Sequence, residues 1–142
     1  MPRAFGLRIQ LQFTYVLDID AAVGKNCPNR KDDVYLVQYL LAVWQAHERN
    51  TTKLLPLLRG TKPMVADGIC GSNTLAVIKS FEDFHQPTVN TDGRIDPFVG
   101  KAQKMFLLNQ LLFFAGGLRG GVPQTRIPIP FPAHLVGQLF RP

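Results

Sequence analysis

The chain has 142 residues, of which 46% are hydrophobic and 18% are charged, a balance that excludes an intrinsically disordered protein. Its net charge is +6, and residues 98–142 supply most of it, with 5 Lys/Arg and no acidic residue. These cations are dispersed and lack interleaved aromatic residues, which argues against a nucleic-acid-binding protein. No apolar run approaches the roughly 20 residues of a membrane span, and polar residues interrupt the N-terminal segment where a signal peptide would be apolar.

The N-terminal region, residues 1–20, is expected to contain one β-strand. Residues 7–17 alternate between apolar and polar side chains, with Leu7, Ile9 and Leu11 on the apolar side. This two-residue period predicts a half-buried strand. A strand needs a partner, and we expect that partner at the other end of the chain. Residues 18–31, rich in Gly, Pro and Asn, are predicted to form a loop.

A helix is predicted over residues 33–48, because apolar residues recur there at helical spacing and Asp32 or Asp33 can cap its start. The following residues, 51–66, are predicted to form a long loop with one helical turn. The two cysteines, Cys27 and Cys70, either form a disulfide or remain separate thiols. We favour separate thiols, because pairing cannot be derived from sequence.

Two Asp-Gly turns, each followed by a helical pattern, are the most informative local feature. An aspartate that accepts backbone N–H groups and a glycine that is free to take positive φ allow tight chain reversal. Asp67-Gly68 precedes a helix predicted over residues 72–84, with Ser72 as its N-cap. Asp92-Gly93 precedes Pro97 and a third helix predicted over residues 98–114, which we expect to be buried on two sides.

The remaining residues, 116–142, are rich in Gly and Pro and basic in character. This composition favours an extended tail, or a disordered one. Ile127, Ile129 and Phe131 recur at every second position, which is also typical of an edge strand. We therefore expect an extended segment that packs near the N-terminal strand.

Three groups of residues together resemble the peptidoglycan-binding domain family, a small three-helix module found beside cell-wall hydrolases and in secreted bacterial effectors. The resemblance covers roughly 80 residues, within a helical domain placed at 21–115. Two positions depart from the family pattern: Cys70 replaces a frequent Phe or Tyr, and Glu82 replaces a Gln. The residues that carry the resemblance are Asp33, Val34, Val37, Gln38, Leu40 and Leu41; then Asp67, Gly68, Gly71, Thr74, Ala76, Ile78 and Phe81; then Asp92, Gly93, Arg94, Ile95, Asp96 and Pro97, with Leu108 and Asn109.

The resemblance implies a three-helix core. Together with the N-terminal β-strand and the extended Pro/Gly-rich C-terminal segment predicted above, it gives a mainly α fold. Six turn residues are expected to be structural: Asp67, Gly68, Gly71, Thr74, Asp92 and Gly93. Four residues are candidates for ligand contact: Arg94, Asp96, Asn73 and Trp44. Arg94 suits a carboxylate of a peptidoglycan stem peptide, and Trp44 could stack on a sugar.

We expect no enzyme and no cofactor, because the three histidines lack metal-ligand spacing and no nucleophile motif is present. The function implied is a non-catalytic module that targets a partner or associated enzyme to peptidoglycan. It would act in the bacterial periplasm or cell wall, reached without a conventional signal peptide. One alternative is an assembly protein of a secretion or phage-like apparatus, with a protein partner at the terminal strand and tail. A weaker alternative is a small peptidoglycan hydrolase or toxin.

Overall fold

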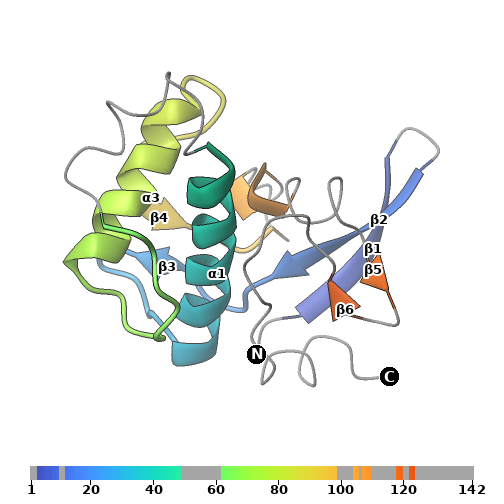
Figure 1. Ribbon diagram of the computed structural model, residues 1–142, viewed down its shortest axis with the longest axis horizontal. Helices are drawn as coiled ribbons and strands as arrows, with labels where there is room; N and C mark the ends of the chain where they lie inside the picture. Colours follow the sequence, from blue (N-terminus) through green and yellow to red (C-terminus); the bar gives the residue numbers. More distant parts are fainter. Residues whose placement is uncertain are drawn as a thin grey trace.

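The computed structural model describes residues 3–9, 12–48, 62–98, 104–105, 107–109, 118–119 and 122–123. Over these residues the protein is partly helical and contains small antiparallel pairs of strands (Figure 1). The helices with complete bounds are α1, Lys31–Glu48, and α3, Ser72–Phe84. The strands are β1, Arg3–Ile9; β2, Gln12–Asp18; β3, Val23–Gly24; β4, Arg94–Ile95; β5, Leu118–Arg119; and β6, Val122–Pro123.

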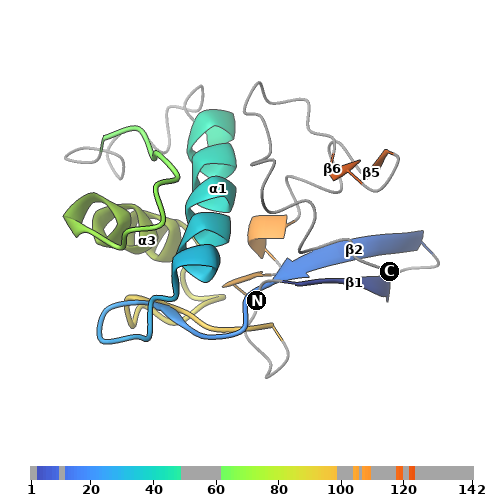
Figure 2. The same cartoon turned by 90° about the horizontal axis from the view of Figure 1, so that it is seen from below.

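Helix α1 is the centre of the molecule. Nearly every position from Asp33 to Trp44 is buried, because this stretch is apolar on all sides of the helix. Figures 1 and 2 show α3 on one side of α1 and the β1–β2 hairpin on the other. Leu17, Leu40 and Phe81 represent these three elements in one buried cluster. The sequence predicted α1 and α3 closely, although burial on two sides was expected of the third helix rather than of α1.

The prediction of one N-terminal strand was wrong. β1 and β2 pair with each other, with Ile9 opposite Gln12 and Arg8 opposite Phe13. The segment expected to be one strand is therefore divided between the two strands of a hairpin. The alternation of apolar and polar residues contains no information on where a chain reverses.

The C-terminal partner expected for this strand falls at residues 127–131, which lie outside the described residues. The residues of the tail that are described, β5 and β6, pair with each other.

Two further elements differ from their predictions. The segment expected to be a loop contains β3, which pairs with β4 of the second Asp-Gly turn. The two segments approach so closely at Gly24 that a Cβ there would clash with the carbonyl oxygen of Gly93. At α3, the N-cap is Gly71 without a side-chain hydrogen bond, not Ser72, which is already helical.

The predicted cap of α1 was also incorrect. Asp33 lies inside the helix, and its carboxylate accepts the backbone N–H groups of Asp20 and Ala21, both at 3.1 Å. Burial raises the pKa of Asp33, against the hydrogen bond from Ala21. This carboxylate therefore fixes the segment after β2 rather than the start of its own helix.

Helical conformation is also present at residues 104–105 and 107–109, while the rest of the predicted third helix lies outside the described residues. Asn109 joins this region to β2: its Oδ1 accepts the N–H of Leu17 at 2.8 Å, and its Nδ2 donates to the Leu17 carbonyl at 3.0 Å. Beside it, the Phe98 N–H donates to Asp18 Oδ1 at 2.7 Å. The end of the hairpin is thus bound to the helical part of the protein.

Candidate binding site

The first Asp-Gly turn is held by a side chain of α1. Gln38 Oε1 accepts the N–H groups of Asp67 and Gly68, each at 2.9 Å. Gln38 Nε2 lies within 3.1 Å of Asp67 Oδ1, the Ile69 carbonyl and Thr74 Oγ1. Gln38 itself is fully buried. One neutral amide therefore satisfies both the donors and the acceptors of the turn.

Within the turn, Asp67 Oδ1 also accepts the Ile69 N–H at 2.9 Å, and Gly68 has a φ of 79°. The hydrogen bonds from Ile69 and Gln38 lower the pKa of Asp67. Asp67 and Gly68 thus do what an Asp-Gly pair does in a tight turn. Gly71 has an extended conformation, with φ −92°, and is not in the left-handed region.

The segment before this turn, residues 62–66, has no regular secondary structure and is bound by two other amide side chains. Gln45, two turns after Gln38 on α1, donates to the Lys62 carbonyl at 3.0 Å and accepts the Met64 N–H at 2.7 Å. Asn73 of α3 accepts the Lys62 N–H at 2.8 Å and donates to its carbonyl at 3.2 Å. These amides replace the hydrogen bonds that a neighbouring strand would supply.

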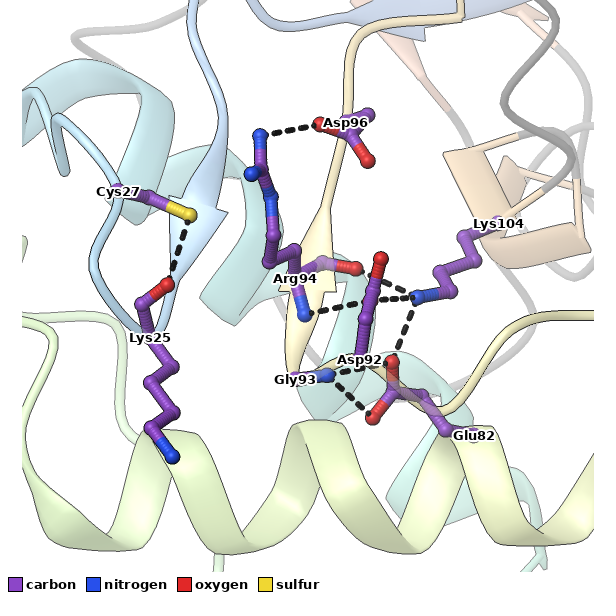
Figure 3. A network of polar contacts seen from close by, with 8 residues as sticks. All are labelled: Lys25, Cys27, Glu82, Asp92, Gly93, Arg94, Asp96 and Lys104. Carbon is purple, nitrogen blue, oxygen red and sulfur yellow. Dashed lines mark hydrogen bonds and ion pairs between the residues drawn. The ribbon is translucent and has the colours of Figure 1, made fainter.

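The second Asp-Gly turn is held by charged groups (Figure 3). Both carboxylate oxygens of Glu82, from α3, lie 3.1 Å from the Gly93 N–H. The Gly93 carbonyl accepts the N–H of Lys25 at 3.0 Å, and Gly93 has a φ of 77°. Asp92 Oδ1 accepts the Arg94 N–H at 3.0 Å. The turn is therefore bound to α3 on one side and to the β3 loop on the other.

Lys104 completes this network from the helical region that follows. Its ammonium lies 2.5 Å from Glu82 Oε2, 2.7 Å from Asp92 Oδ1 and 2.7 Å from the Arg94 carbonyl. All three donors of the ammonium thus have an acceptor. The side chain is only 7% exposed and Glu82 only 1%. A buried ion pair with this many partners is costly to break from one side.

The pKa values of Glu82 and Asp92 are shifted in opposite directions. Burial raises the pKa of Glu82, even though Lys104 and Gly93 donate to it. At Asp92, burial also acts to raise the pKa, but hydrogen bonds from Lys104 and Arg94 outweigh it and hold the pKa below its usual value. The difference follows from exposure, because Asp92 is 40% exposed.

The outer surface of this turn carries an exposed ion pair. Arg94 Nη2 lies 3.0 Å from Asp96 Oδ1, with side chains 45% and 41% exposed. Figure 3 shows the Arg94 guanidinium pointing away from the Lys104 ammonium, toward Asp96 and the side of the network where Cys27 lies. The backbone of Arg94 is bound into the network, whereas its guanidinium remains accessible. Such a group can exchange its surface partner for the carboxylate of a ligand.

Of the four predicted ligand residues, Arg94 and Asp96 lie together and the other two lie elsewhere. Asn73 is bound to the backbone of Lys62. Trp44 is 2% exposed, with its ring edge-on to Phe81 at 5.5 Å between centroids, and it presents no face for a sugar to stack on. Its apolar spacing on α1 is that of a core residue. The candidate site is therefore the outer surface of the second turn.

The sequence did not predict that Gln38 would hold the first turn or that Lys104 would hold the second. Gln38 was noted only as part of the resemblance, and Lys104 only as one of five dispersed cations. One signal was present: Glu82 stands where the domains that the sequence resembles often have Gln, and a buried carboxylate needs a cation. Its partner, 22 positions later, could not be chosen from local pattern.

Comparison with known proteins found no protein-family model that matches the chain, and no match among curated proteins or solved structures. Over the described part of the chain, no three His, Cys, Asp or Glu side chains gather where they would hold a metal ion. Among the same residues, no helix has both the length and the apolar composition that a membrane span requires.

Proposed function

We propose that the protein is a non-catalytic module that binds peptidoglycan and thereby places a partner or an associated enzyme at the bacterial cell wall. The observation that carries the proposal is the exposed Arg94–Asp96 pair, on a turn whose backbone is bound by buried groups. A stem peptide offers carboxylates, which suit the planar donor fork of Arg94. A turn that is already ordered loses little entropy on binding.

The resemblance to peptidoglycan-binding domains gives a second line of support. Its first and second groups of residues meet in the hydrogen bonds of Gln38 with Asp67, Gly68 and Thr74. Its third group is bound to α3 through Glu82 and Gly93. Residues that were grouped by pattern alone thus contact one another, and this supports the proposal.

The test is co-sedimentation with purified insoluble peptidoglycan. We expect the protein to sediment at low salt and Arg94→Ala to lose at least tenfold in apparent affinity. Lys79→Ala is the matched control, because Lys79 forms an exposed ion pair with Asp83 at 3.2 Å on α3 and its loss removes the same charge. This variant should sediment like the unmodified protein. An equal loss in both variants would mean that the protein binds peptidoglycan through its net charge and not through a specific contact of Arg94.

A second comparison identifies the group recognised. Peptidoglycan whose carboxylates have been converted to amides should bind weakly, whereas Asp96→Asn, which frees the Arg94 guanidinium, should keep or strengthen binding to unmodified peptidoglycan. If the folded protein stays in the supernatant at low salt, peptidoglycan binding is wrong. Zymography on the same material tests the non-catalytic part of the proposal, which any lytic band would overturn.

The alternative, an assembly protein, is favoured by the β1–β2 hairpin. Its sheet has two strands of seven residues, and it lies on the side of α1 away from α3 (Figure 2). Two-stranded hairpins are marginal alone and gain stability when another strand or surface covers them. Light scattering after size-exclusion chromatography tests this: a strictly monomeric protein at all concentrations would count against self-assembly.

A further inference from the structure

Arg94 lies in β4 with its own backbone groups turned away from β3. It is paired with Gly24, and the hydrogen bond beside this pair runs from the Lys25 N–H to the Gly93 carbonyl at 3.0 Å. In an antiparallel pair of strands, a residue at such a position directs its N–H and carbonyl to the side away from the neighbouring strand. Both backbone groups of Arg94 therefore need partners on the side opposite β3.

A side-chain ion pair binds both of these groups. Asp92 Oδ1 accepts the Arg94 N–H at 3.0 Å, and Lys104 Nζ donates to the Arg94 carbonyl at 2.7 Å. Asp92 Oδ1 and Lys104 Nζ also contact each other, at 2.7 Å. A joined acceptor and donor thus take the place of a neighbouring strand along β4. Lys104 is anchored in turn by the buried carboxylate of Glu82.

We propose that Lys104 is a positioning residue for Arg94: it holds the backbone of Arg94 and so fixes the direction in which the guanidinium leaves the turn. The inference rests on the proposed function, in which Arg94 contacts a carboxylate of peptidoglycan. The rotamers that a side chain can adopt depend on the backbone angles of its own residue. In Figure 3 the Arg94 guanidinium points away from the Lys104 ammonium, while the carbonyl of the same residue faces it.

Burial keeps Lys104 itself from contact with a ligand. Its side chain is almost fully buried, and its three donors are occupied by Glu82, Asp92 and the Arg94 carbonyl. Any effect of Lys104 on binding is therefore transmitted through the residues that it holds. A side chain whose backbone is already fixed loses less conformational entropy on binding, and we expect this to be worth about tenfold in affinity.

The test variant is Lys104→Met combined with Glu82→Gln. It removes the donor to the Arg94 carbonyl without leaving a buried charge, and the amide at position 82 can still accept the Gly93 N–H. We expect a cooperative unfolding transition in denaturant, which shows that the double variant is folded. In co-sedimentation with insoluble peptidoglycan, its apparent affinity should be about tenfold lower than that of the unmodified protein. Unchanged affinity would overturn the proposal.

Lys79→Met is the matched control, because it removes a cation from an exposed ion pair of α3 and should bind like the unmodified protein. A cycle with Arg94→Ala then tests whether the effect passes through Arg94. In the Arg94→Ala background, adding Lys104→Met and Glu82→Gln should cause no further loss of binding, since no guanidinium remains to be positioned. An equal further loss in both backgrounds would contradict the proposal.

Backbone amide relaxation, measured by NMR, gives a result that does not depend on peptidoglycan. The order parameter of the Arg94 amide should fall in the double variant, whereas that of Gly68, which Gln38 holds in the first turn, should not change. An Arg94 amide as ordered as in the unmodified protein would mean that Lys104 does not position it. If the unmodified protein fails to sediment with peptidoglycan, the proposed function is wrong, and relaxation alone decides whether Lys104 positions Arg94.

Discussion

The two Asp-Gly turns have the same backbone design but are stabilised by opposite chemistry. In both, an aspartate accepts the N–H two positions later and a glycine takes positive φ. The first turn is then held by a neutral amide, Gln38, and the second by a buried ion pair, Glu82 with Lys104. The surfaces differ as well: Ile69 of the first turn is 69% exposed and apolar, whereas the second turn exposes Arg94 and Asp96.

The same turn conformation can therefore be stabilised by a neutral amide or by an ion pair. An amide satisfies backbone groups without a change of charge, so it depends little on pH or salt. A buried ion pair must recover the free energy of removing two charges from water, and its net contribution is small even though breaking it is costly. The second turn therefore keeps a charged interior beneath a charged surface, and in the proposed function this surface is the one that contacts a charged ligand.

The largest expected effect is at Lys104. Lys104→Met removes the cation and leaves the Glu82 carboxylate buried without its partner, so we expect the free energy of unfolding to fall by about 3–5 kcal/mol. Denaturant unfolding measures it. Adding Glu82→Gln should recover most of the loss, because the amide oxygen can still accept the Gly93 N–H without a buried charge. A loss below about 1 kcal/mol in the single variant would mean that the ion pair is not buried.

A smaller effect is expected at Gln38. Gln38→Leu leaves the N–H groups of Asp67 and Gly68 without their acceptor, which should cost about 2–3 kcal/mol. Gln38→Glu removes the donor and keeps the acceptor. Its carboxylate can still accept the two N–H groups, but its second oxygen faces two other acceptors, the Ile69 carbonyl and Asp67 Oδ1. Its pKa should therefore be raised, and its stability relative to the unmodified chain should improve as the pH falls from 7 to 4. Equal deficits at both pH values would contradict this account.

How much of this could be predicted depended on how local the information was. The helix over residues 72–84 was predicted with its observed bounds, because a turn and a helical period adjoin in the sequence. The hairpin and the β3–β4 pair were missed, since pairing is a long-range choice that alternation does not encode. For the candidate site, Arg94 and Asp96 are close in sequence and in space. Lys104 and Gln38 act through contacts 10 to 36 positions away, for which the sequence alone offered no partner.

An intermediate effect is expected from acid at the second turn. The pKa of Asp92 is lowered in the folded protein, so its contribution to stability is complete above the unfolded value near 3.8 and is lost as the pH falls through the folded value. Asp92→Asn should therefore be less stable than the unmodified chain at pH 6, by roughly 1 kcal/mol because the group is partly exposed. Below pH 3.8 the free energies of unfolding of the variant and of the unmodified protein should become equal. A constant difference across this range would assign the effect to something other than titration of Asp92.

The smallest expected effect on stability is at Arg94, whose side chain and backbone have different roles in the second turn. The Arg94 guanidinium contacts Asp96 at the surface, while its backbone carries the bonds to Asp92 and Lys104. Arg94→Ala keeps the backbone, so the midpoint of denaturant unfolding should stay at that of the unmodified chain, as for Lys79→Ala. Denaturant unfolding of both variants checks this. A clear drop in the midpoint at Arg94 alone would make its side chain part of the scaffold, and a loss of peptidoglycan binding in that variant would then reflect a disordered turn. A stable Arg94→Ala that fails to bind leaves contact with the ligand as the remaining role of this side chain.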